Sequence, residues 1–457
     1  MNRRQFLQLC AAFPCAFSIP VYADESVSFA AGLQKAFDAL DFQPEKGKRE
    51  FFVTAADIHY TEDQNHAQNR AFRFLIHELN TLPEDLLPDH LMILGDCICS
   101  MSPCFSYGPN VPKALKEYAN LREDLAVLNP KIPVRVIAGN HDTPPFDEES
   151  EVFCREMKTP PYYRYECAGL PILALDGGHD GFLGKKQRAW LKEETAKLQP
   201  ERNVAILIHQ PMGFTNERGL AETLPDALKN QTGEVYVLAG HEHHDATAYF
   251  QLPKTRLTQW THIRTGGAGF NSNGGPSWWV YCVEDGRITA RIQRCMNGQI
   301  VAHRVVAPDE KSLRPIIAPF SQVQEKCVVR ALLGEDESYE LVTCKGGNCG
   351  SYFFYLKSAT FKIHVPAGAK PSKMAVLGNL NSGFNGTPKP EVDRKRHVFL
   401  SADGENWDEA PFGERTKDFL YWLEIPEKFR SAADLFVRVD APGMAANDVL
   451  AGFGLFE

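Results

Sequence analysis

The chain of 457 residues lacks most of the features that mark specialised classes of protein. It has no internal repeat and no low-complexity tract, and nothing in it suggests disorder, collagen or a coiled coil. No stretch after the first two dozen residues is apolar for long enough to span a bilayer. It also has no lysine- or arginine-rich run, and its net charge is −9, so it lacks the electrostatic footprint of a nucleic-acid-binding protein. What remains is an ordinary globular composition, long enough for two or three domains.

The first 23 residues are predicted to be a signal peptide rather than part of the fold. The run Arg3-Arg4-Gln5-Phe6-Leu7 resembles a twin-arginine export signal and opens an apolar stretch. Val21-Tyr22-Ala23 then offers the small-x-small pattern that signal peptidase cuts. A general secretory signal and an uncleaved membrane anchor are the alternatives. The sequence therefore predicts a periplasmic or secreted protein with the twin-arginine export machinery as a partner.

Cysteine usage fits an oxidising compartment but fixes no pairing. Ten of the twelve cysteines lie beyond the predicted signal, and in such a compartment some of them should pair. The best local candidate is Cys344 with Cys349, which flank a short loop. Other cysteines that could pair among themselves are Cys97, Cys99, Cys104 and Cys154. No cluster has a CxxC partner elsewhere, which argues against a thiolate metal site.

Strand-like apolar runs alternate with helix-like stretches over residues 50–305. The predicted strands are Phe51–Ala55, His90–Leu94, Val134–Ala138, Ile172–Leu175, Val204–Ile208, Val235–Ala239, Trp278–Val283 and Ile288–Ile292. The predicted helices are Gln68–Leu79, Pro112–Leu128 and Lys185–Leu198. Alternating strands and helices predict an α/β domain in which helices cover the faces of a sheet.

The rest of the chain is predicted to form a second domain. Residues 24–49 are an N-terminal segment, and residues 306–321, which contain prolines, are a linker. Residues 322–457 carry short β-rich runs between Gly and Pro turns and predict an antiparallel β-sandwich. His397–Trp407 resembles a hairpin of galactose-binding-like jelly rolls, which would imply a glycan or cell-surface ligand. The alternative is a purely structural sandwich.

Five short blocks, each at the end of a predicted strand, offer metal ligands. They are Asp57-Ile58-His59, Gly95-Asp96, Gly139-Asn140-His141-Asp142, Ile208-His209-Gln210-Pro211 and Gly240-His241-Glu242-His243. Their carboxylate, imidazole and amide donors suit a pair of hard or borderline divalent metals. The two-residue spacing of Asp57 and His59 would let both side chains of an extended chain aim at one metal. The two oxygens of Asp96 could bridge two metals.

A pair of metals predicts phosphate-ester chemistry. Two divalent cations about 3.5–4 Å apart can generate a hydroxide near neutral pH and hold the phosphoryl oxygens of an in-line displacement. His141 follows Asn140 and is placed to protonate the leaving alkoxide, because imidazolium suits that role near pH 7. Asp142 is expected to support His141 from behind.

The blocks in this order resemble the calcineurin-like metallophosphoesterase superfamily. The resemblance implies a four-layer αββα fold over residues 50–305. It implies that metal 1 is held by Asp57, His59, Asp96 and His243, and metal 2 by Asp96, Asn140, His209 and His241. Manganese, iron, zinc or magnesium would fit these ligands. Glu242 lies within the last block but is not a ligand in that pattern.

Departures from the family pattern favour a phosphodiesterase. Purple acid phosphatases place a tyrosine three residues after the bridging aspartate and lack the first-block histidine, whereas this chain has Cys99 and His59. The Gly-Asn-His-Asp and His-Gln-Pro sequences resemble those of bacterial cyclic-nucleotide and glycerophosphodiester phosphodiesterases. The sequence thus predicts an exported hydrolase of small phosphate esters. The alternatives are a phosphomonoesterase or nucleotidase of the same fold, and a non-catalytic exported glycan-binding protein.

Overall fold

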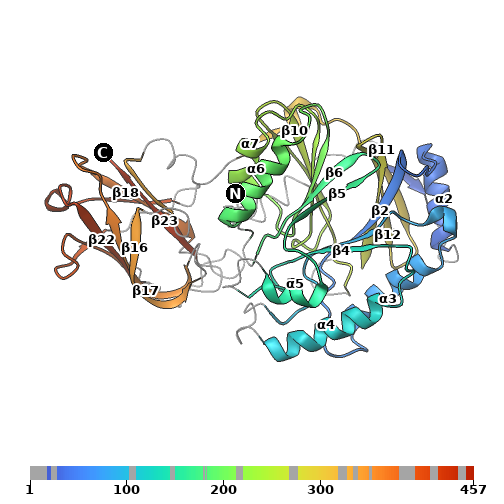
Figure 1. The fold of residues 1–457 in the computed structure, drawn as a ribbon, viewed down its shortest axis with the longest axis horizontal. Helices are drawn as coiled ribbons and strands as arrows, with labels where there is room; N and C mark the ends of the chain where they lie inside the picture. Colours follow the sequence, from blue (N-terminus) through green and yellow to red (C-terminus); the bar gives the residue numbers. More distant parts are fainter. Residues whose placement is uncertain are drawn as a thin grey trace. The chain divides into compact units, whose positions relative to one another are not determined.

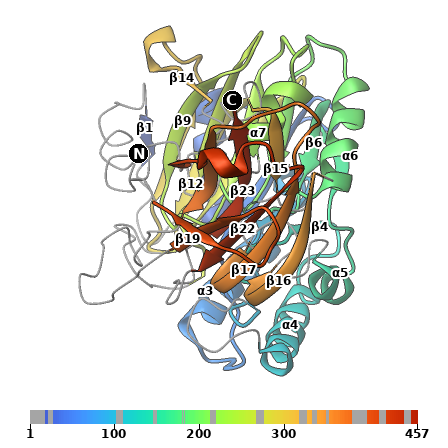
Figure 2. The same ribbon diagram turned by 90° about the vertical axis from the view of Figure 1, so that its left-hand side faces the viewer.

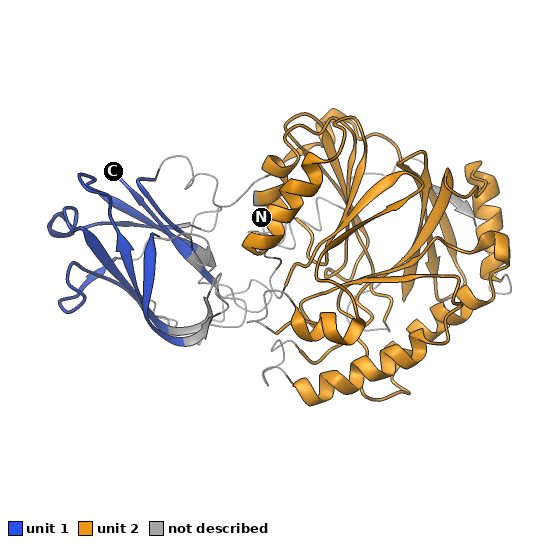
Figure 3. Ribbon diagram, viewed as in Figure 1, with its two compact units in different colours: residues 1–7, 214–218, 317–457 blue, residues 8–213, 219–316 orange. Residues whose placement is uncertain are grey.

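The computed structural model describes residues 18–21, 28–101, 110–144, 150–178, 181, 183–212, 220–266, 276–316, 327–332, 338–348, 353–379, 397–411, 420–440 and 449–457. The chain divides into two compact units, which Figure 3 colours separately. We call residues 8–213 and 219–316 the layered unit. The other unit contains residues 317–457 and is called the β unit.

The first sheet of the layered unit has seven strands in the order β1-β13-β12-β11-β2-β3-β4. In that order they are β1 Ser18–Val21, β13 Ile300–Arg304, β12 Arg287–Cys295, β11 Ser277–Glu284, β2 Arg49–Ala55, β3 Leu91–Leu94 and β4 Val134–Ile137. Strands β2, β3 and β4 are parallel, and the pairs from β1 to β2 are antiparallel. The carboxyl ends of the three parallel strands therefore meet at one edge of this sheet.

The second sheet also has seven strands, in the order β14-β9-β10-β8-β7-β6-β5. In that order they are β14 Arg314–Pro315, β9 Ala246–Gln251, β10 Arg256–Thr261, β8 Val235–Ala239, β7 Val204–Leu207, β6 Leu170–Ala174 and β5 Tyr163–Cys167. Strands β10, β8, β7 and β6 are parallel to one another. This sheet thus gathers a second set of carboxyl ends.

Helices cover the outer face of each sheet. The α-helices are α2 Phe29–Leu40, α3 Ala67–Asn80, α4 Val111–Leu125, α5 Glu151–Met157, α6 Lys185–Ala196 and α7 Leu220–Ala227, and short 3-10 helices occupy Glu84–Leu86, Glu310–Ser312 and Glu427–Phe429. Figure 1 shows α2, α3 and α4 on one side of the paired sheets and α6 and α7 on the other. None of the described helices combines the length and the apolar character needed to cross a bilayer.

Three hydrophobic layers hold the sheets and helices together. In β2, Phe51 and Val53 belong to the core under α2 and α3, whereas Phe52 belongs to the core between the two sheets. In β7, Ala205 faces the inter-sheet core and Val204 the core under α6 and α7. Both faces of these strands are buried, so they appear in the sequence as continuous apolar runs rather than alternating ones. This arrangement gives the mixed α/β fold predicted from the sequence.

The layered unit is larger than residues 50–305. Helix α2 lies in the segment predicted to be separate, but its Phe29, Leu33 and Phe37 are buried in the same core as β2. Strand β14 lies in the predicted linker and pairs in parallel with β9. Within the predicted signal, Ser18–Val21 forms β1 beside β13, while residues 1–17 and 22–27 lie outside the described residues. Cleavage of the signal stays a prediction.

The described part of the β unit consists of strands joined by turns and loops, with one short 3-10 helix and no α-helix. Its sheet has the order β20-β19-β22-β17-β23-β18-β21, with β15 added to β23 and β16 added to β17. The strands are β15 Val329–Leu332, β16 Tyr339–Asn348, β17 Phe353–His364, β18 Lys373–Asn379, β19 His397–Ser401, β20 Asp408–Ala410, β21 Leu420–Glu424, β22 Asp434–Asp440 and β23 Val449–Phe456. Figure 2 shows β19, β22, β17 and β16 side by side. A jelly-roll topology stays a prediction.

The hairpin singled out in the sequence joins β19 to β20. The Asp403 carboxylate accepts hydrogen bonds from the backbone N–H groups of Glu405 and Asn406, both at 2.8 Å. These bonds close the turn locally. The Trp407 ring lies 4.8 Å from the Arg438 guanidinium carbon on the neighbouring strand β22.

Candidate metal centre

The five predicted blocks follow five parallel strands of the two sheets. Asp57 and His59 follow β2, Asp96 follows β3 and Asn140 follows β4 in the first sheet. In the second sheet His209 follows β7, and His241 and His243 follow β8. Carboxyl ends of parallel strands are where α/β folds place their ligands. The structure brings all seven predicted ligands together there.

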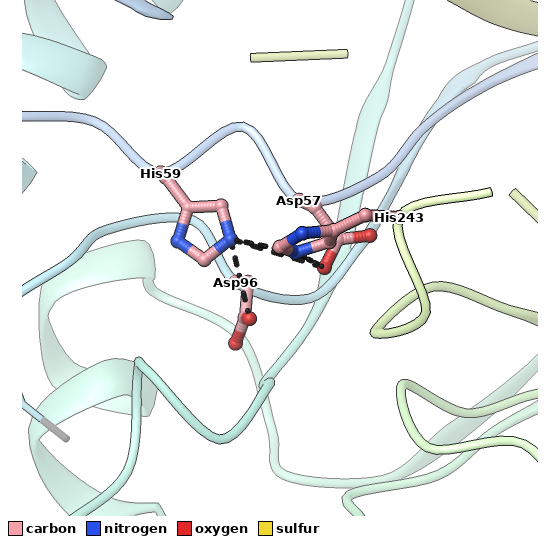
Figure 4. A group of neighbouring side chains, drawn as sticks. All are labelled: Asp57, His59, Asp96 and His243. Atoms are coloured by element: carbon pink, nitrogen blue, oxygen red, sulfur yellow. Dashed lines mark hydrogen bonds and ion pairs between the residues drawn. The ribbon is translucent and has the colours of Figure 1, made fainter. Parts of the chain in front are cut away.

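The first group contains Asp57, His59, Asp96 and His243, whose ligand atoms lie within 4.8 Å of one another (Figure 4). The Nε2 atom of His243 lies 3.2 Å from Asp57 Oδ1 and 3.2 Å from His59 Nε2. His59 Nε2 lies 3.5 Å from Asp96 Oδ2. Two carboxylates and two imidazoles therefore converge on one point.

The second group contains Asp96, His209 and His241, with Asn140 beside them. His209 Nε2 lies 3.2 Å from Asp96 Oδ2 and 3.1 Å from Asn140 Oδ1. His241 Nδ1 lies 2.8 Å from the same Asn140 oxygen. Asp96 belongs to both groups, which is the position of a bridging ligand.

The backbone of most of these residues adopts a left-handed conformation, which directs their side chains toward the centre. Five of the seven lie in the left-handed region, namely Asp57 (φ 52°), His59 (φ 48°), Asp96 (φ 51°), His241 (φ 70°) and His243 (φ 57°). This conformation costs about 1–2 kcal/mol for each non-glycine residue. The prediction that Asp57 and His59 align along an extended chain is therefore wrong, because the chain turns just after β2 ends. Strain of this kind is typical of functional sites.

Glycines let the ligand loops approach one another. A Cβ atom on Gly139 would lie 2.3 Å from Asp96 Oδ1, and one on Gly240 would lie 2.8 Å from Asp57 Oδ2. On Gly95, with φ 82°, it would lie 2.5 Å from His209 Nδ1. Each glycine thus occupies a place where no larger residue fits without moving a predicted ligand.

Backbone groups fix the orientation of the ligands. Nδ1 of His209 lies 2.8 Å from the Leu94 carbonyl oxygen, which leaves Nε2 to face the centre. The N–H of His241 donates to both oxygens of Asp57 at 3.0 Å. The N–H of His141 donates to Asp96 Oδ1 at 2.8 Å, so Oδ2 is the oxygen that faces the histidines.

The electrostatics favour bound cations. Burial acts to raise the pKa of Asp57, but the nearby His243 and His209 hold it at about 2. Burial acts to lower the pKa of His209, but the carboxylates of Asp96 and Asp57 raise it to about 9. Burial and the charge of His209 lower the pKa of His241 to about 3. Two ionised carboxylates side by side in a buried site, with oxygen and nitrogen donors around them, fit a pair of divalent cations.

His141 and Asp142 occupy different environments. The His141 ring centre lies 4.7 Å from that of His59, and its Nδ1 lies 3.0 Å from the Cys99 carbonyl oxygen. The Asp142 carboxylate accepts hydrogen bonds from the N–H groups of Cys97 (3.0 Å) and Gly139 (2.8 Å). Burial and the charge of Asp96 raise the pKa of Asp142 to about 7. Asp142 is fully buried and joins two ligand loops, a role different from the expected direct support of His141.

Sequence reasoning missed Arg264, which follows β10 and is 8% exposed. Burial lowers the pKa of its guanidinium, while Asp57, Cys99 and Asp96 act in the opposite direction. A buried cation beside the two groups favours an anionic ligand. In the sequence, the one signal for Arg264 is that an arginine stands directly before Thr265-Gly266, just after the apolar run of β10.

The cysteines near the centre are not bridged to one another. Cys97 is buried in the core under the helices, and Cys99 Sγ donates to the His59 carbonyl oxygen at 3.2 Å. The sequence left open a pairing among Cys97, Cys99 and Cys154, and the structure forms none, because all three are free thiols, as is Cys344. Cys104 and Cys349 lie outside the described residues.

Fold and site together place two overlapping groups of candidate metal ligands at the carboxyl ends of the strands of a mixed α/β unit. Residues 52–245 match the family model described as calcineurin-like phosphoesterase. This segment is therefore similar to that family, in agreement with the resemblance on which the predicted superfamily rests.

Two curated relatives resemble part of the chain. A probable cyclic nucleotide phosphodiesterase of Fibrobacter succinogenes is 36% identical over 146 residues, which are 29% of this chain and 55% of that protein. The serine/threonine-protein phosphatase CPPED1 of Danio rerio is 26% identical over 179 residues, covering 35% of this chain and 55% of that protein. The chain thus spans about half the length of each of these relatives.

Among solved structures, a purple acid phosphatase from yellow lupin seeds is similar with a TM-score of 0.38 and 11% identity, covering 55% of this chain and 52% of that one. A 5′-nucleotidase from Candida albicans is similar with a TM-score of 0.29 and 12% identity, covering 51% of this chain and 52% of that one.

Proposed function

We propose that the chain hydrolyses small phosphate esters, with phosphodiesters preferred, at a centre of two divalent cations. The observation that carries the proposal is the sharing of Asp96 between two overlapping groups of ligands. Metal 1 would be held by Asp57, His59, Asp96 and His243, and metal 2 by Asp96, Asn140, His209 and His241. When bound, such a pair would polarise the phosphoryl oxygens and lower the pKa of a water molecule. Manganese, iron, zinc and magnesium all accept this donor set.

The protein's own residues position the reaction. The left-handed turns after β2, β3 and β8 hold the ligands before substrate arrives, so little reorganisation is needed on binding. His141 lies beside the first group and would protonate the leaving oxygen. Its Nδ1 faces the Cys99 carbonyl, which leaves Nε2 for the proton that is transferred.

A direct test uses bis-(p-nitrophenyl) phosphate with the purified protein and added manganese. We expect hydrolysis that a chelator abolishes and that manganese restores. A protein that is folded and metal-loaded but inactive on a panel of phosphodiesters and monoesters would contradict the proposal. It would favour the non-catalytic alternative.

The role of His141 has its own test. We expect His141→Ala to lower turnover by roughly 10²–10⁴-fold while metal content stays near the wild-type value. The loss should be larger for an alkyl ester than for a p-nitrophenyl ester, because p-nitrophenolate leaves without protonation. His77→Ala, on the exposed face of α3, is the control. Equal loss of metal and turnover would assign His141 to the metal shell instead.

A phosphomonoesterase or nucleotidase is the second candidate. One curated relative is named a phosphodiesterase and the other a phosphatase, so the names do not agree on the substrate. Comparing kcat/KM for matched alkyl diesters and monoesters separates the two. A preference for the monoester of tenfold or more would replace the diester proposal.

We also infer that the protein is exported to the periplasm or secreted by the twin-arginine route. The paired arginines Arg3 and Arg4 and the apolar stretch after them support this. Export should stop when both arginines are replaced by lysine or when the twin-arginine translocase is absent. Export that persists under both conditions would point to the general secretory route.

The β unit offers a surface for a glycan. A cavity of about 490 Å³ is lined by Trp422, Phe456, Lys373 and Glu424. The two rings lie 4.9 Å apart, and flat aromatic faces beside polar groups suit a sugar ring. We expect Trp422→Ala to abolish retention on a polysaccharide that the wild type binds, and Trp407→Ala to leave it unchanged. Failure of the wild type to bind a glycan panel would favour a structural role.

A further inference from the structure

A second cavity lies in the layered unit, apart from the predicted metal ligands. It has a volume of about 640 Å³ and is formed by the end of α4, the end of α5 and parts of β4 and β5. Strands β4 and β5 are the outermost strands of their two sheets. None of the seven predicted ligands lines the cavity. Its volume falls in the range of small-molecule sites in proteins.

The wall of this cavity is basic, although the whole chain is acidic. Four cationic side chains line it, Arg122, Arg135, Lys158 and Arg164, against one carboxylate, Glu156. The chain as a whole has a net charge of −9. The concentration of positive charge here is therefore a local feature and not a consequence of composition.

The carboxylates around the cavity do not neutralise it. Three acids form ion pairs with Arg122 or Arg164, and each of them also pairs with one cation that does not line the cavity. The pairs are Glu156 with Arg122 and Arg155, Glu166 with Arg164 and Arg202, and Glu194 with Arg164 and Lys197. No described carboxylate forms an ion pair with Arg135 or Lys158, although the charges of Asp89 and Arg135 act on each other.

Arg135 carries the strongest indication of a missing partner. Its guanidinium carbon lies 4.2 Å above the centre of the Tyr165 ring, a contact that holds the plane of the guanidinium. Its Nε–H is buried and has no hydrogen-bond acceptor in the described part of the chain. Buried donors are nearly always satisfied, so this one marks Arg135 as a side chain whose hydrogen bonds are not completed within the described protein.

Much of the rest of the wall is apolar, although the hydroxyl-bearing residues Thr159 and Tyr163 also line it. Leu125, Met157 and Pro160 line the cavity together with the cations. A free inorganic ion would leave this surface uncovered, whereas an organic anion would use both parts of the wall. Arginine is the residue best suited to bind phosphate oxygens through two parallel hydrogen bonds.

We propose that this cavity binds a small organic phosphate, with the phosphate on Arg135 and Lys158 and the carbon body against Leu125, Met157 and Pro160. The site does not depend on the metal centre or on the proposed hydrolysis. It would give the layered unit a second place at which a phosphorylated metabolite is recognised.

Calorimetric titration of the full chain, freed of metal with a chelator, tests the proposal. The probes are AMP, which has a phosphate and an organic body, inorganic phosphate, which lacks the body, and adenosine, which lacks the charge. We expect AMP to bind with one site per chain, and inorganic phosphate and adenosine to bind at least tenfold more weakly. Equal binding of adenosine, or of inorganic phosphate, would overturn the proposal.

Paired variants separate this site from a general effect of charge. Arg135→Gln with Lys158→Gln should weaken AMP binding by tenfold or more. Lys116→Gln with Lys131→Gln removes the same charge from exposed positions outside the cavity and should leave binding unchanged. Because Arg135 stacks on Tyr165, Lys158→Gln alone serves as the variant least able to disturb folding. Equal affinity in all of these proteins, or no AMP binding by the wild type at millimolar concentration, would refute the site.

Discussion

The layered unit contains buried charged residues and residues with positive φ, whereas the described part of the β unit contains almost no buried polar residue. All ten of the described non-glycine residues with positive φ lie in the layered unit, and five of them are predicted metal ligands. The described part of the β unit buries only two polar residues, Thr360 and Ser401, and no charged one. Its main apolar cluster is built from residues such as Phe361, Val437 and Phe453, and a small second cluster contains Ala375 and Leu377.

The apolar interior of the β unit contributes to stability, whereas the strained and charged residues of the layered unit reduce stability and provide chemistry. Left-handed non-glycine residues and buried carboxylates cost free energy and persist only where the surrounding fold enforces them. Changes near the metal centre should therefore reduce activity far more than stability. Changes in the β unit should do the reverse. Four measurements test whether the two units differ in this way.

The largest effect is expected at Asp96, which belongs to both ligand groups. Asp96→Asn keeps an oxygen for the His141 N–H but removes the negative charge that two cations would share. We expect phosphoesterase activity to fall by at least about 100-fold and metal content to drop, with the melting temperature of the metal-free protein nearly unchanged. The exposed Asp226→Asn is the control. Retained metal and activity would remove Asp96 from the centre.

The β unit should respond in the opposite direction. Phe453 is fully buried, and its ring centre lies 5.1 Å from that of Phe361. Phe453→Ala should destabilise this unit by about 3–5 kcal/mol, as measured by denaturant unfolding followed at a β-unit tryptophan. The phosphoesterase activity of the folded protein should stay within twofold of wild type. A large loss of activity without unfolding would show that the units are coupled.

Acid should destabilise the layered unit selectively. His262 Nε2 lies 2.8 Å from the Tyr281 hydroxyl, and its Nδ1 lies 2.6 Å from the Ala239 carbonyl oxygen. Burial lowers the pKa of His262 from 6.5 to about 4, so the unfolded chain binds this proton at higher pH than the folded one. Stability is therefore lost as pH falls from about 6.5 to about 4, by up to about 3 kcal/mol.

The matching variant is His262→Gln, in which this contribution to the pH dependence of unfolding should disappear. Urea unfolding at a series of pH values checks it. An unchanged slope between pH 6.5 and 4 would assign the acid sensitivity to other groups.

The smallest difference compares two glycines with similar backbone angles. Gly95 (φ 82°) would bring a Cβ to 2.5 Å from His209, whereas Gly368 (φ 88°) in the β unit has nothing within 4 Å. Gly368→Ala should cost only the backbone term, about 1 kcal/mol. Gly95→Ala should cost more and also lower metal affinity. If thermal unfolding shows the same loss of stability for Gly95→Ala and Gly368→Ala, the loop around His209 can move to accept a Cβ atom without strain.

Much of the fold could be predicted from local pattern. The runs at Val204–Ile208 and Val235–Ala239 became β7 and β8, because strands buried on both faces must be continuously apolar. Helix α2 was missed, although it buries Phe29 and Leu33, because no strand precedes it to start the alternating pattern. The prediction likewise missed β14, because a two-residue strand has no periodicity to detect.

The candidate site could be predicted as a set of residues but not as a geometry. Donor type and position after a strand indicated seven side chains that the structure brings together, including His209, which stands alone in its block. The backbone turns that aim Asp57 and His59 could not be predicted, because a left-handed residue other than glycine leaves little trace in sequence. Arg264 could not be predicted either, since its role depends on loops that meet only in the folded chain.

The chemistry available to this protein follows from its amino-acid sequence alone, because side-chain type decides which atoms can bind a metal or move a proton. The division into an α/β part and a β-rich part follows from the sequence too, since periodicity is local. Three relations arise only on folding: Asp96 belongs to two groups, Asp142 accepts hydrogen bonds from two loops, and basic residues of α4, β4 and β5 and the C-cap of α5 line one cavity. Those relations join residues distant in the chain, and sheet pairing and core packing alone bring them together.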